Sequence, residues 1–391
     1  MKIILAPDSF KGSLSAEAVC DALHTGLRRV LPDAEIVQRP MADGGEGTLD
    51  AVVAAMKASG SRRKQALVKN AAGQSAEASY ALIKHGVIYE AALIEVAQIV
   101  GIEDAHNMMV PVADRSSYGV GELMRLLMAD GIRHFFIGLG GTSTNDGGAG
   151  LLSALGVKFT GTFRREISPT PNGLKKLISV DVTALDSRLT DCEITLLSDV
   201  NNVLTGEHGA TAIFGPQKGV AKADIRAVDN VLAAYAERLE AALQKRAANK
   251  PGAGAAGGLG YALQLLGAKF ESGAQTVARL TGLAAACKNA DWLITGEGRT
   301  DAQTLLGKTP FTAAQIAREH GNPGLKATLI SGGVDAGSLA LLTATFNGGC
   351  FSIVPGPMAL DQAVIRAPEL LANAAEQIAR LWAHQASTLS T

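Results

Sequence analysis

Residues 134–150 read HFFIGLGGTSTNDGGAG, an apolar run that passes directly into a glycine-rich polar segment. Leucine and alanine then recur at helical spacing, so the pattern predicts a strand, a tight loop and a helix. Gly140 and Gly141 would let a ligand reach bare backbone amides, and the start of the helix adds N–H donors and a positive dipole end. Such a loop suits an anion. The alternative is a simple turn in which Asn145 or Asp146 only caps the helix.

The composition is typical of an α/β protein with an aliphatic core. Of the 391 residues, 47% are hydrophobic, only 4% are aromatic and 44 residues are glycine. A chain of this length predicts two domains. The formal net charge of -1 does not indicate a polyanionic partner, so we expect neither nucleic acid nor an anionic membrane as a partner.

The cysteines and the N-terminal residues bear on the compartment. The four cysteines are scattered without a C-x-x-C pair, which indicates neither a disulfide framework nor a thiolate metal site. The first apolar run is too short for a signal peptide, and no apolar window approaches ~20 residues without a charge or a glycine. We therefore expect a cytoplasmic protein with no membrane span.

Polar side chains follow several predicted strands at the point where each strand ends. They are Asp8, Ser9 and Lys11 after strand 3–6, Asp43 and Glu46 after strand 35–38, Asp199 after strand 194–197, and Glu297, Arg299 and Asp301 after strand 292–295. Open α/β sheets bind ligands outside the carboxyl ends of their strands, so we expect these side chains to converge on one crevice. For each of them, a solvated loop or a helix cap is the alternative.

These residue types suit phosphate, metal and acid binding. Asp43 and Glu46 stand beside glycines and could hold Mg²⁺ through water or position a substrate hydroxyl, although acids also favour the first turn of a helix. Glu297, Arg299 and Asp301 combine two carboxylates with a fork-shaped cation in one short loop. That combination suits a metal-bound phosphate or the carboxylate of a hydroxy acid.

Three further segments could contact phosphate. Lys218 is framed by glycine and proline within residues 215–219, which is a rigid mount for an ammonium group, with a surface turn as the alternative. Residues 252–257 satisfy G-x-G-x-x-G without a preceding strand, so we reject a dinucleotide site and keep only phosphate contact by amides such as those of Gly257 and Gly258. Residues 307–309 resemble the end of a Walker A motif, but position 302 is alanine where that motif needs glycine, so we also reject a P-loop around Lys308.

Other patterns complete the prediction. Residues 66–69, 76–83 and 87–95 predict consecutive antiparallel strands, and residues 361–384 predict one closing helix. Glu95 is a lone acid in an apolar run and lies either at a site or on a solvated strand face. The seven histidines show no H-E-x-x-H spacing and the chain has no G-x-S-x-G elbow, which disfavours zinc hydrolysis and Ser-His chemistry. Amides, acids, lysine and arginine remain, and these groups are typical of phosphate and Mg²⁺ sites.

Six sequence blocks resemble the signature blocks of one known family. They are residues 6–15 (APDSFKGSLS), 42–48 (ADGGEGT), 140–148 (GGTSTNDGG), 214–219 (FGPQKG), 251–260 and 295–299 (TGEGR). In this order and over nearly the whole chain, they are similar to the bacterial glycerate kinase family, of the glycerate 2-kinase type. Val120 departs from the family pattern, which usually has threonine there.

The resemblance implies a two-domain α/β fold and an activity. One domain would be a flavodoxin-like parallel sheet formed by residues 1–65 and 290–391, and the other an inserted mixed α/β domain formed by residues 66–289, with the active site in the cleft between them. A competing division places the strands near residues 134, 194, 292, 327 and 350 in a single sheet. The implied activity is ATP- and Mg²⁺-dependent phosphorylation of D-glycerate, commonly to 2-phosphoglycerate.

Loop position suggests roles for individual residues. We expect Asp199 first and Asp301 second as the base that takes the proton of the glycerate hydroxyl. The other expected roles are catalysis or carboxylate clamping for Lys11, substrate binding for Asp8, Ser9, Arg299 and Asn145, nucleotide binding for Gly140, Gly141, Gly257, Gly258, Lys218 and Lys308, and Mg²⁺ binding for Asp43, Glu46 and Glu297. A kinase of another small hydroxy acid and a non-catalytic sugar-acid-binding protein are the alternatives.

Overall fold

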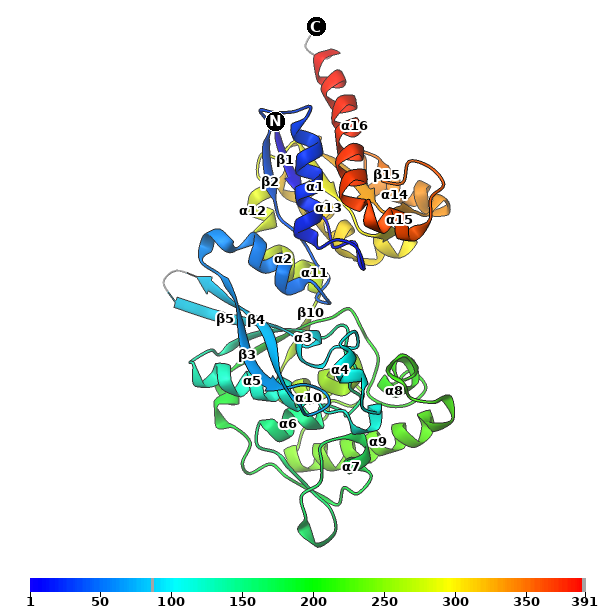
Figure 1. The fold of residues 1–391 in the computed structure, drawn as a ribbon. Helices are drawn as coiled ribbons and strands as arrows, with labels where there is room; N and C mark the ends of the chain where they lie inside the picture. The colour runs from blue at the N-terminus through cyan, green and yellow to red at the C-terminus, as the bar shows by residue number, and fades with distance from the viewer. Residues whose placement is uncertain (86–87, 389–391) are drawn as a thin grey trace. The chain divides into compact units, whose positions relative to one another are not determined.

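The computed structural model describes residues 1–85 and 88–388. Contacts divide the chain into two compact units. Unit 1 comprises residues 1–43, 50–58 and 274–391, and unit 2 comprises residues 44–49 and 59–273. Figure 1 shows the course of the chain from blue at the N-terminus to red at the C-terminus. The predicted domain bounds stay a prediction.

Unit 1 is built on a five-stranded parallel sheet with the strand order β15-β13-β11-β1-β2. The strands are β1 (Lys2–Leu5), β2 (Glu35–Gln38), β11 (Trp292–Thr295), β13 (Lys326–Ser331) and β15 (Cys350–Ser352). Parallel strands that are covered on both faces read as continuous apolar runs, and the buried residues Ile3, Ile4 and Leu5 of β1 show this pattern. In register, Ile3 lies between Trp292 and Ile36.

The order of these five strands is that of a flavodoxin-like sheet. The chain runs from β1 outward to β2 on one side, and it continues on the other side of β1 with β11, β13 and β15. The strand order therefore reverses between β1 and β11, and ligands of such sheets bind at this switch point, outside the carboxyl ends of the strands. The loops that follow β1 and β11 are thus the first place to look for a site.

Helices and one aromatic pair close the core of unit 1. The helices are α1 (Ala16–Arg28), α11 (Gly273–Leu280), α12 (Leu283–Cys287), α13 (Thr309–His320), α14 (Leu339–Thr345), α15 (Leu360–Ile365) and α16 (Ala367–Thr388). One boundary between the units falls inside α2 (Thr48–Ala55). Helices α1 and α16 lie side by side (Figure 1), so closely that a Cβ at Gly26 would meet the carbonyl oxygen of Ala372 at 2.0 Å. Buried Trp292 stacks on Trp382 with ring centroids 4.5 Å apart.

The single closing helix predicted for residues 361–384 is wrong, because the structure has two helices there. Helix α15 ends at Ile365, and α16 begins at Ala367. Pro368 is the second residue of α16. Proline fits the first turn of a helix, but it has no N–H to donate to the preceding turn of a helix that continues through it.

Unit 2 contains a six-stranded mixed sheet with the order β10-β9-β6-β5-β4-β3. The strands are β3 (Arg62–Lys69), β4 (Ser75–His85), β5 (Ile88–Glu95), β6 (His134–Gly138), β9 (Glu193–Leu197) and β10 (Lys269–Glu271). The first three pair antiparallel, as predicted, and the pairs from β5 to β10 are parallel. Residue 87, which the prediction included in a strand, lies outside the described residues.

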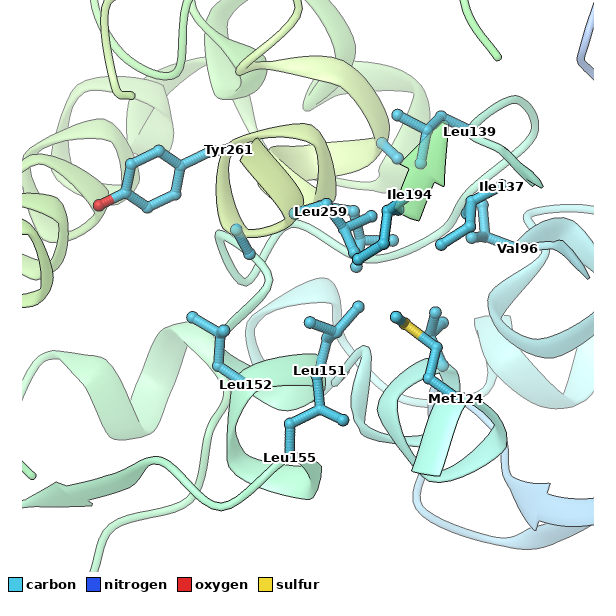
Figure 2. Close-up of a cluster of buried hydrophobic side chains, with 14 of the residues drawn as sticks. Val96, Met124, Ile137, Leu139, Leu151, Leu152, Leu155, Ile194, Leu259 and Tyr261 are labelled. Carbon is cyan, nitrogen blue, oxygen red and sulfur yellow. The ribbon is translucent and has the colours of Figure 1, made fainter. Parts of the chain in front are cut away.

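Helices pack around the central strands of unit 2. They are α3 (Ala97–Val100), α4 (Ala105–Met108), α5 (Tyr118–Ala129), α6 (Ala149–Ala154), α7 (Pro171–Leu174), α8 (Ala210–Phe214), α9 (Ile225–Leu243) and α10 (Leu259–Leu265). Figure 2 shows the centre of this core, where Ile137 and Ile194 from the sheet lie in one cluster with Leu151 and Leu152 of α6 and Met124 of α5. The predicted strand, loop and helix at residues 134–150 are therefore present as β6 and α6.

Two short two-stranded sheets complete the structure. In unit 1, β12 (Arg299–Thr300) pairs with β14 (Gly333–Val334), and in unit 2, β7 (Lys158–Thr160) pairs with β8 (Ser179–Asp181). The predicted α/β class, with one flavodoxin-like parallel sheet and one mixed sheet, is confirmed. Within residues 1–85 and 88–388, no helix combines the length and the apolar character needed to cross a membrane.

Candidate active site

Unit 1 holds a cavity of about 620 Å³ at the carboxyl ends of its parallel strands. The loops after β1, β11, β13 and β15 all contribute to its wall, together with the start of α13 and residues of α15. The predicted site residues that line it are Asp8, Ser9, Lys11, Asp43, Glu297, Arg299 and Lys308. This is the location that the flavodoxin-like strand order favours for a ligand.

Asp8 is the most enclosed acid of the cavity. The N–H of Asp8 donates to the carbonyl of Gly296 at 2.9 Å, which links the loops after β1 and β11. Only 7% of Asp8 is exposed, and burial, followed by the charge of Asp43, raises its pKa to about 7. The backbone N–H of Ser9, which donates to Oδ1 of Asp8 at 2.6 Å, and the hydroxyl of Thr309 act in the opposite direction. Asp8 can therefore accept or donate a hydrogen bond near neutral pH.

An ion pair stands at the mouth of the cavity. Lys11 Nζ lies 3.3 Å from Asp43 Oδ2, with 68% of the lysine side chain and 34% of the aspartate side chain exposed. Exposed pairs of this kind contribute only about 0–1 kcal/mol to stability. Their position on the cavity wall therefore explains these residues better than stability does.

The loop after β11 places a second acid on the cavity wall. Glu297 accepts hydrogen bonds from the hydroxyls of Thr300 at 3.1 Å and Thr304 at 2.6 Å. Burial raises the pKa of Glu297, and the Thr304 hydroxyl opposes that shift. Arg299 follows as the exposed first residue of strand β12 and also lines the cavity. Acid and cation thus come from one loop, as the sequence pattern predicts.

Asp301 and Lys308 flank a short 3-10 helix, Ala302–Leu306. Asp301 caps it, because its carboxylate accepts from the N–H of Gln303 at 2.9 Å. Asp301 also lies near Lys308, whose Nζ is 4.0 Å from Oδ1 of Asp301. The capping contact accounts for an acid at position 301 in local terms, and the catalytic role of Asp301 stays a prediction.

The cavity also includes residues that the sequence reasoning did not assign. Thr309 opens α13, and Asp335 follows the glycines at positions 332 and 333 after β13. The signal at Asp335 is the same one that identified Asp8 and Asp43, an acid shortly after a strand end. The apolar part of the wall, which comes from the region of β15 and α15, carried no such signal.

The glycine-rich loop after β6 belongs to unit 2, and Asp146 organises it. Asp146 has no exposed surface, and its carboxylate accepts from the N–H and hydroxyl of Ser117 and from the N–H groups of Gly148 and Gly150. Burial raises the pKa of Asp146, while the bonds from Ser117 and the two glycines oppose that rise. The helix-capping alternative therefore describes this residue, because Gly148 and Gly150 form the start of α6.

Lys218 is buried and binds the same loop through hydrogen bonds. Only 2% of the residue is exposed, and its Nζ donates to Thr142 Oγ1 at 3.0 Å and to the carbonyl of Thr144 at 2.8 Å. Arg115 donates to the carbonyls of Ser143 and Lys218, so two cations hold the loop from one side. Burial lowers the pKa of Lys218 to about 7. Its predicted role in phosphate binding remains untested.

Close packing accounts for several glycines of unit 2. A Cβ at Gly257, where φ is +67°, would meet the carbonyl oxygen of Thr144 at 2.0 Å, and one at Gly258 would meet Gly147 Cα at 2.5 Å. A Cβ at Gly140 would meet Gly45 Cα at 2.8 Å. The segment around residue 257 therefore lies against residues 144–147. For Gly140, Gly141, Gly257 and Gly258, nucleotide binding stays a prediction.

Asn145 lies beside these glycines with no exposed surface. Its Nδ2 donates to Thr211 Oγ1 at 3.0 Å. Asn145 Oδ1 and Thr144 Oγ1 are buried polar atoms for which the described part of the chain provides no hydrogen-bond partner. Such atoms usually bind something, most often water.

The remaining predicted residues also belong to unit 2. Asp199 is exposed just after β9, and Glu46 is exposed in the loop before α2. Glu95 is buried rather than on a solvated strand face, and its carboxylate accepts from the N–H of Leu49 in the first turn of α2. Acids favour this position at a helix start.

Comparison with known proteins decides the family. The model of the glycerate kinase family matches residues 3–383. The chain belongs to the glycerate kinase family. It is 39% identical over 383 residues to the glycerate kinase of Halalkalibacterium halodurans C-125, covering 96% of this chain and 97% of the relative. It is 41% identical over 329 residues to the glycerate 2-kinase of Escherichia coli K12, covering 83% of this chain and 84% of the relative.

A solved structure agrees with this assignment. A crystal structure assigned as glycerate kinase 2 of Salmonella typhimurium LT2 superposes with a TM-score of 0.83 at 38% identity, covering 98% of this chain and 99% of that chain. The family resemblance predicted from the six sequence blocks is confirmed, and family membership makes the chain an enzyme of the kinase class.

Proposed function

We propose that the protein transfers the γ-phosphoryl group of ATP to D-glycerate and that the product is 2-phosphoglycerate. Family membership supports the reaction class, and the name of the E. coli relative, a glycerate 2-kinase, supports the position of the phosphate. The observation that carries the proposal is the cavity of unit 1, where cations and carboxylates from separate strand ends surround one volume at the switch point of the sheet.

The cations of this cavity suit the charge of the reactants. Lys11 lines it from the loop after β1, and Arg299 and Lys308 line it from the segment between β11 and α13. ATP and glycerate are both anions, and phosphoryl transfer depends mainly on positioning the reactants and neutralising charge. Arg299 offers two parallel donors to the carboxylate of glycerate or to a phosphate, and the two lysines act as point charges.

The substrate hydroxyls require polar partners as well. Asp8 and Ser9 lie on the wall of the same cavity and can hydrogen-bond to the hydroxyls of a three-carbon acid. Asn145, the fourth predicted substrate contact, belongs to unit 2 and has a buried oxygen without a partner among the residues that the structure describes. Substrate binding by these residues is part of the proposal.

The carboxylates fit Mg²⁺ in the manner of a nucleotide-bound ion. Asp43 and Glu297 line the cavity, and carboxylate oxygens are hard ligands. Among residues 1–85 and 88–388, no group of three His, Cys, Asp or Glu side chains could form a metal site by itself. Mg²⁺ commonly uses only one or two carboxylates and takes its other ligands from phosphates and water, and there it neutralises phosphate charge. Asp43 and Glu297 would hold it, with Glu46 as a further predicted ligand.

The proton acceptor is proposed to be an aspartate, Asp199 first and Asp301 second. Asp199 follows β9 in unit 2, and Asp301 lies beside Lys308, which lines the cavity of unit 1. The proposal also places the enzyme in the cytoplasm. The thiols of Cys20, Cys192, Cys287 and Cys350 are free, which is typical of a reducing compartment.

Release of ADP tests the proposed reaction. Purified protein with ATP and Mg²⁺ is offered D-glycerate, L-glycerate, glycolate and D-lactate in separate reactions. The proposal expects ADP release to be fastest with D-glycerate. Preference for another acid would retain a kinase and replace the substrate, and absence of ADP release with every acid would contradict the proposal.

A pair of lysine variants tests the site of this reaction. Lys308→Met removes a cation from the cavity wall and should lower kcat/KM by at least ~10-fold. Lys326→Met is the matched control, because Lys326 is exposed at the amino end of β13, at the opposite edge of the sheet from the cavity. Equal activity of the two variants would argue against the cavity as the reaction site.

A further inference from the structure

The two ends of the cavity in unit 1 differ in chemistry. The polar end consists of the loops after β1 and β11, with Asp8, Lys11, Glu297 and Arg299. The other end is apolar, and its wall is formed by Ile353, Val354, Leu360, Val364 and Ala367. This set is called the apolar end below. A ligand that fills the cavity therefore has one charged half and one apolar half.

The sheet sets the distance between these two ends. The polar end lies at the switch point between β1 and β11, and Ile353 and Val354 follow the edge strand β15, which is the second neighbour of β11. Neighbouring strands are about 4.8 Å apart, so Ile353 and Val354 lie roughly 10 Å from the end of β11 across the sheet. An elongated ligand can reach both ends, whereas a three-carbon acid reaches only one.

The apolar end is held in place by a contact with the polar loop. The hydroxyl of Ser13 donates to the carbonyl of Val364 at 2.9 Å, which ties α15 to the loop after β1. Leu360, at the start of α15, lines the cavity and yet 80% of its surface is exposed. A bound ligand that covered Leu360 would remove this apolar surface from water.

The volume and the lining exclude glycerate as the occupant of the apolar end. A cavity of about 620 Å³ is within the range of about 300–1,000 Å³ found for pockets of cofactor-sized ligands. Glycerate carries a charge and two hydroxyl groups, which would lose hydrogen bonds to water without gaining partners among aliphatic side chains. A nucleoside has the opposite character, because the flat faces of its base gain from apolar contact.

We propose that the apolar end of this cavity is the subsite for the base and ribose of the nucleotide, with the phosphates directed toward Lys11, Arg299 and Lys308. This inference rests on the proposed function, which supplies ATP as the ligand. It assigns Leu360, Val364 and their neighbours to nucleotide affinity, and it leaves the carboxylate and hydroxyl groups of glycerate to the polar end.

Calorimetric titration with ADP, in the presence of Mg²⁺, tests the subsite directly. Leu360→Asn makes the wall polar, and Ala363→Phe fills the space with a residue of α15 that also lines the cavity. Loss of the apolar contact between Leu360 and the bound ligand should raise the Kd for ADP by at least ~10-fold, and the phenylalanine should have a similar effect through steric exclusion. Ile365→Asn is the matched control, because Ile365 belongs to the same helix, is 71% exposed and does not line the cavity.

Inorganic tripolyphosphate separates the two ends of the cavity. It carries the phosphates without base or ribose, so its Kd should stay within about 2-fold of the wild-type value in both subsite variants. The KM for D-glycerate should also be unchanged while the KM for ATP rises. Circular dichroism of each variant verifies that the protein is folded, and Leu360→Asn alters a side chain that is largely exposed.

The outcomes distinguish this inference from the proposed function. Wild-type affinity for ADP in both variants, or a rise in the KM for D-glycerate instead of ATP, would overturn the subsite even if the wild-type enzyme phosphorylates glycerate. Failure of the wild-type protein to bind ADP would overturn it as well. The expected pattern of ADP affinities in a protein that does not phosphorylate D-glycerate would support the subsite and refute the proposed function.

Discussion

Replacement of Asp146 by alanine should destabilise the protein strongly. The Asp146 carboxylate has no exposed surface and accepts four hydrogen bonds, from Ser117 N at 2.7 Å, Ser117 Oγ at 2.8 Å, Gly148 N at 3.0 Å and Gly150 N at 3.1 Å. Asp146→Ala leaves all four donors without this acceptor inside the protein.

The size of the effect follows from these four donors. A buried donor left unsatisfied costs about 1–3 kcal/mol, which gives roughly 4–12 kcal/mol for four. The lower end applies, because the substitution also removes a buried carboxylate whose pKa is raised by desolvation, and because water can enter the space. We expect a loss of about 4 kcal/mol, a large part of the 5–15 kcal/mol that stabilises a typical domain.

Urea unfolding followed by far-ultraviolet circular dichroism measures this loss. Tryptophan fluorescence is less suitable, because Trp292 and Trp382, the two tryptophans of the chain, both belong to unit 1 and Asp146 belongs to unit 2. Asp146→Asn is the control, because it keeps one carbonyl oxygen and should lose about half as much stability. An Asp146→Ala protein that unfolds at the wild-type urea concentration would refute the reasoning.

Three further predictions concern a buried cation, a glycine contact and the proton acceptor. Burial lowers the pKa of Lys218 from 10.5 to about 7, so the unfolded state binds more protons than the folded state between these pH values. The free energy of unfolding of the wild type, relative to that of Lys218→Met, should therefore rise with pH in this range by at most about 1.4 kcal/mol per pH unit. A difference that falls with pH would contradict the lowered pKa of Lys218. Gly257→Ala should lower the stability by more than about 2 kcal/mol, because the new Cβ would meet the carbonyl oxygen of Thr144. Gly219 has a φ of +98° but open space around it, so Gly219→Ala should lower the stability by only about 1 kcal/mol. Equal losses of stability in thermal unfolding would contradict the role of close packing at Gly257. Asp199→Asn should lower kcat about 100-fold or more if Asp199 is the base. If Asp199→Asn keeps near-wild-type kcat while Asp301→Asn has a strongly reduced kcat, Asp301 is the base instead.

The strand ends of unit 1 were predictable because they depend on local sequence. Asp8, Asp43 and Glu297 each follow a short apolar run and precede a helix, and parallel strands bring such positions to one edge of a sheet. The same reasoning located the strand and helix around residues 134–150. The closing segment forms two helices instead of one, because Pro368 fits the first turn of a helix but not its interior.

Contacts between distant residues could not be predicted in this way. The partners of Lys218 are Thr142 and Thr144, more than seventy residues away in the sequence, and Asp146 depends on Ser117, twenty-nine residues away. A lysine between glycine and proline has the same local pattern whether it faces solvent or a buried loop. The apolar end of the cavity was missed for a related reason, since Leu360 and Val364 have the spacing of ordinary helix residues.

The central claim is that the γ-phosphoryl group of ATP passes to the 2-hydroxyl of D-glycerate. Phosphorus nuclear magnetic resonance of the reaction mixture tests it most directly, because the resonance of the product and its coupling to the carbon-bound protons identify the oxygen that carries the phosphate. We expect a signal coupled to one proton, that of 2-phosphoglycerate, growing together with ADP. A signal coupled to two equivalent or near-equivalent protons, that of 3-phosphoglycerate, or loss of ATP without any phosphorylated acid, would contradict it.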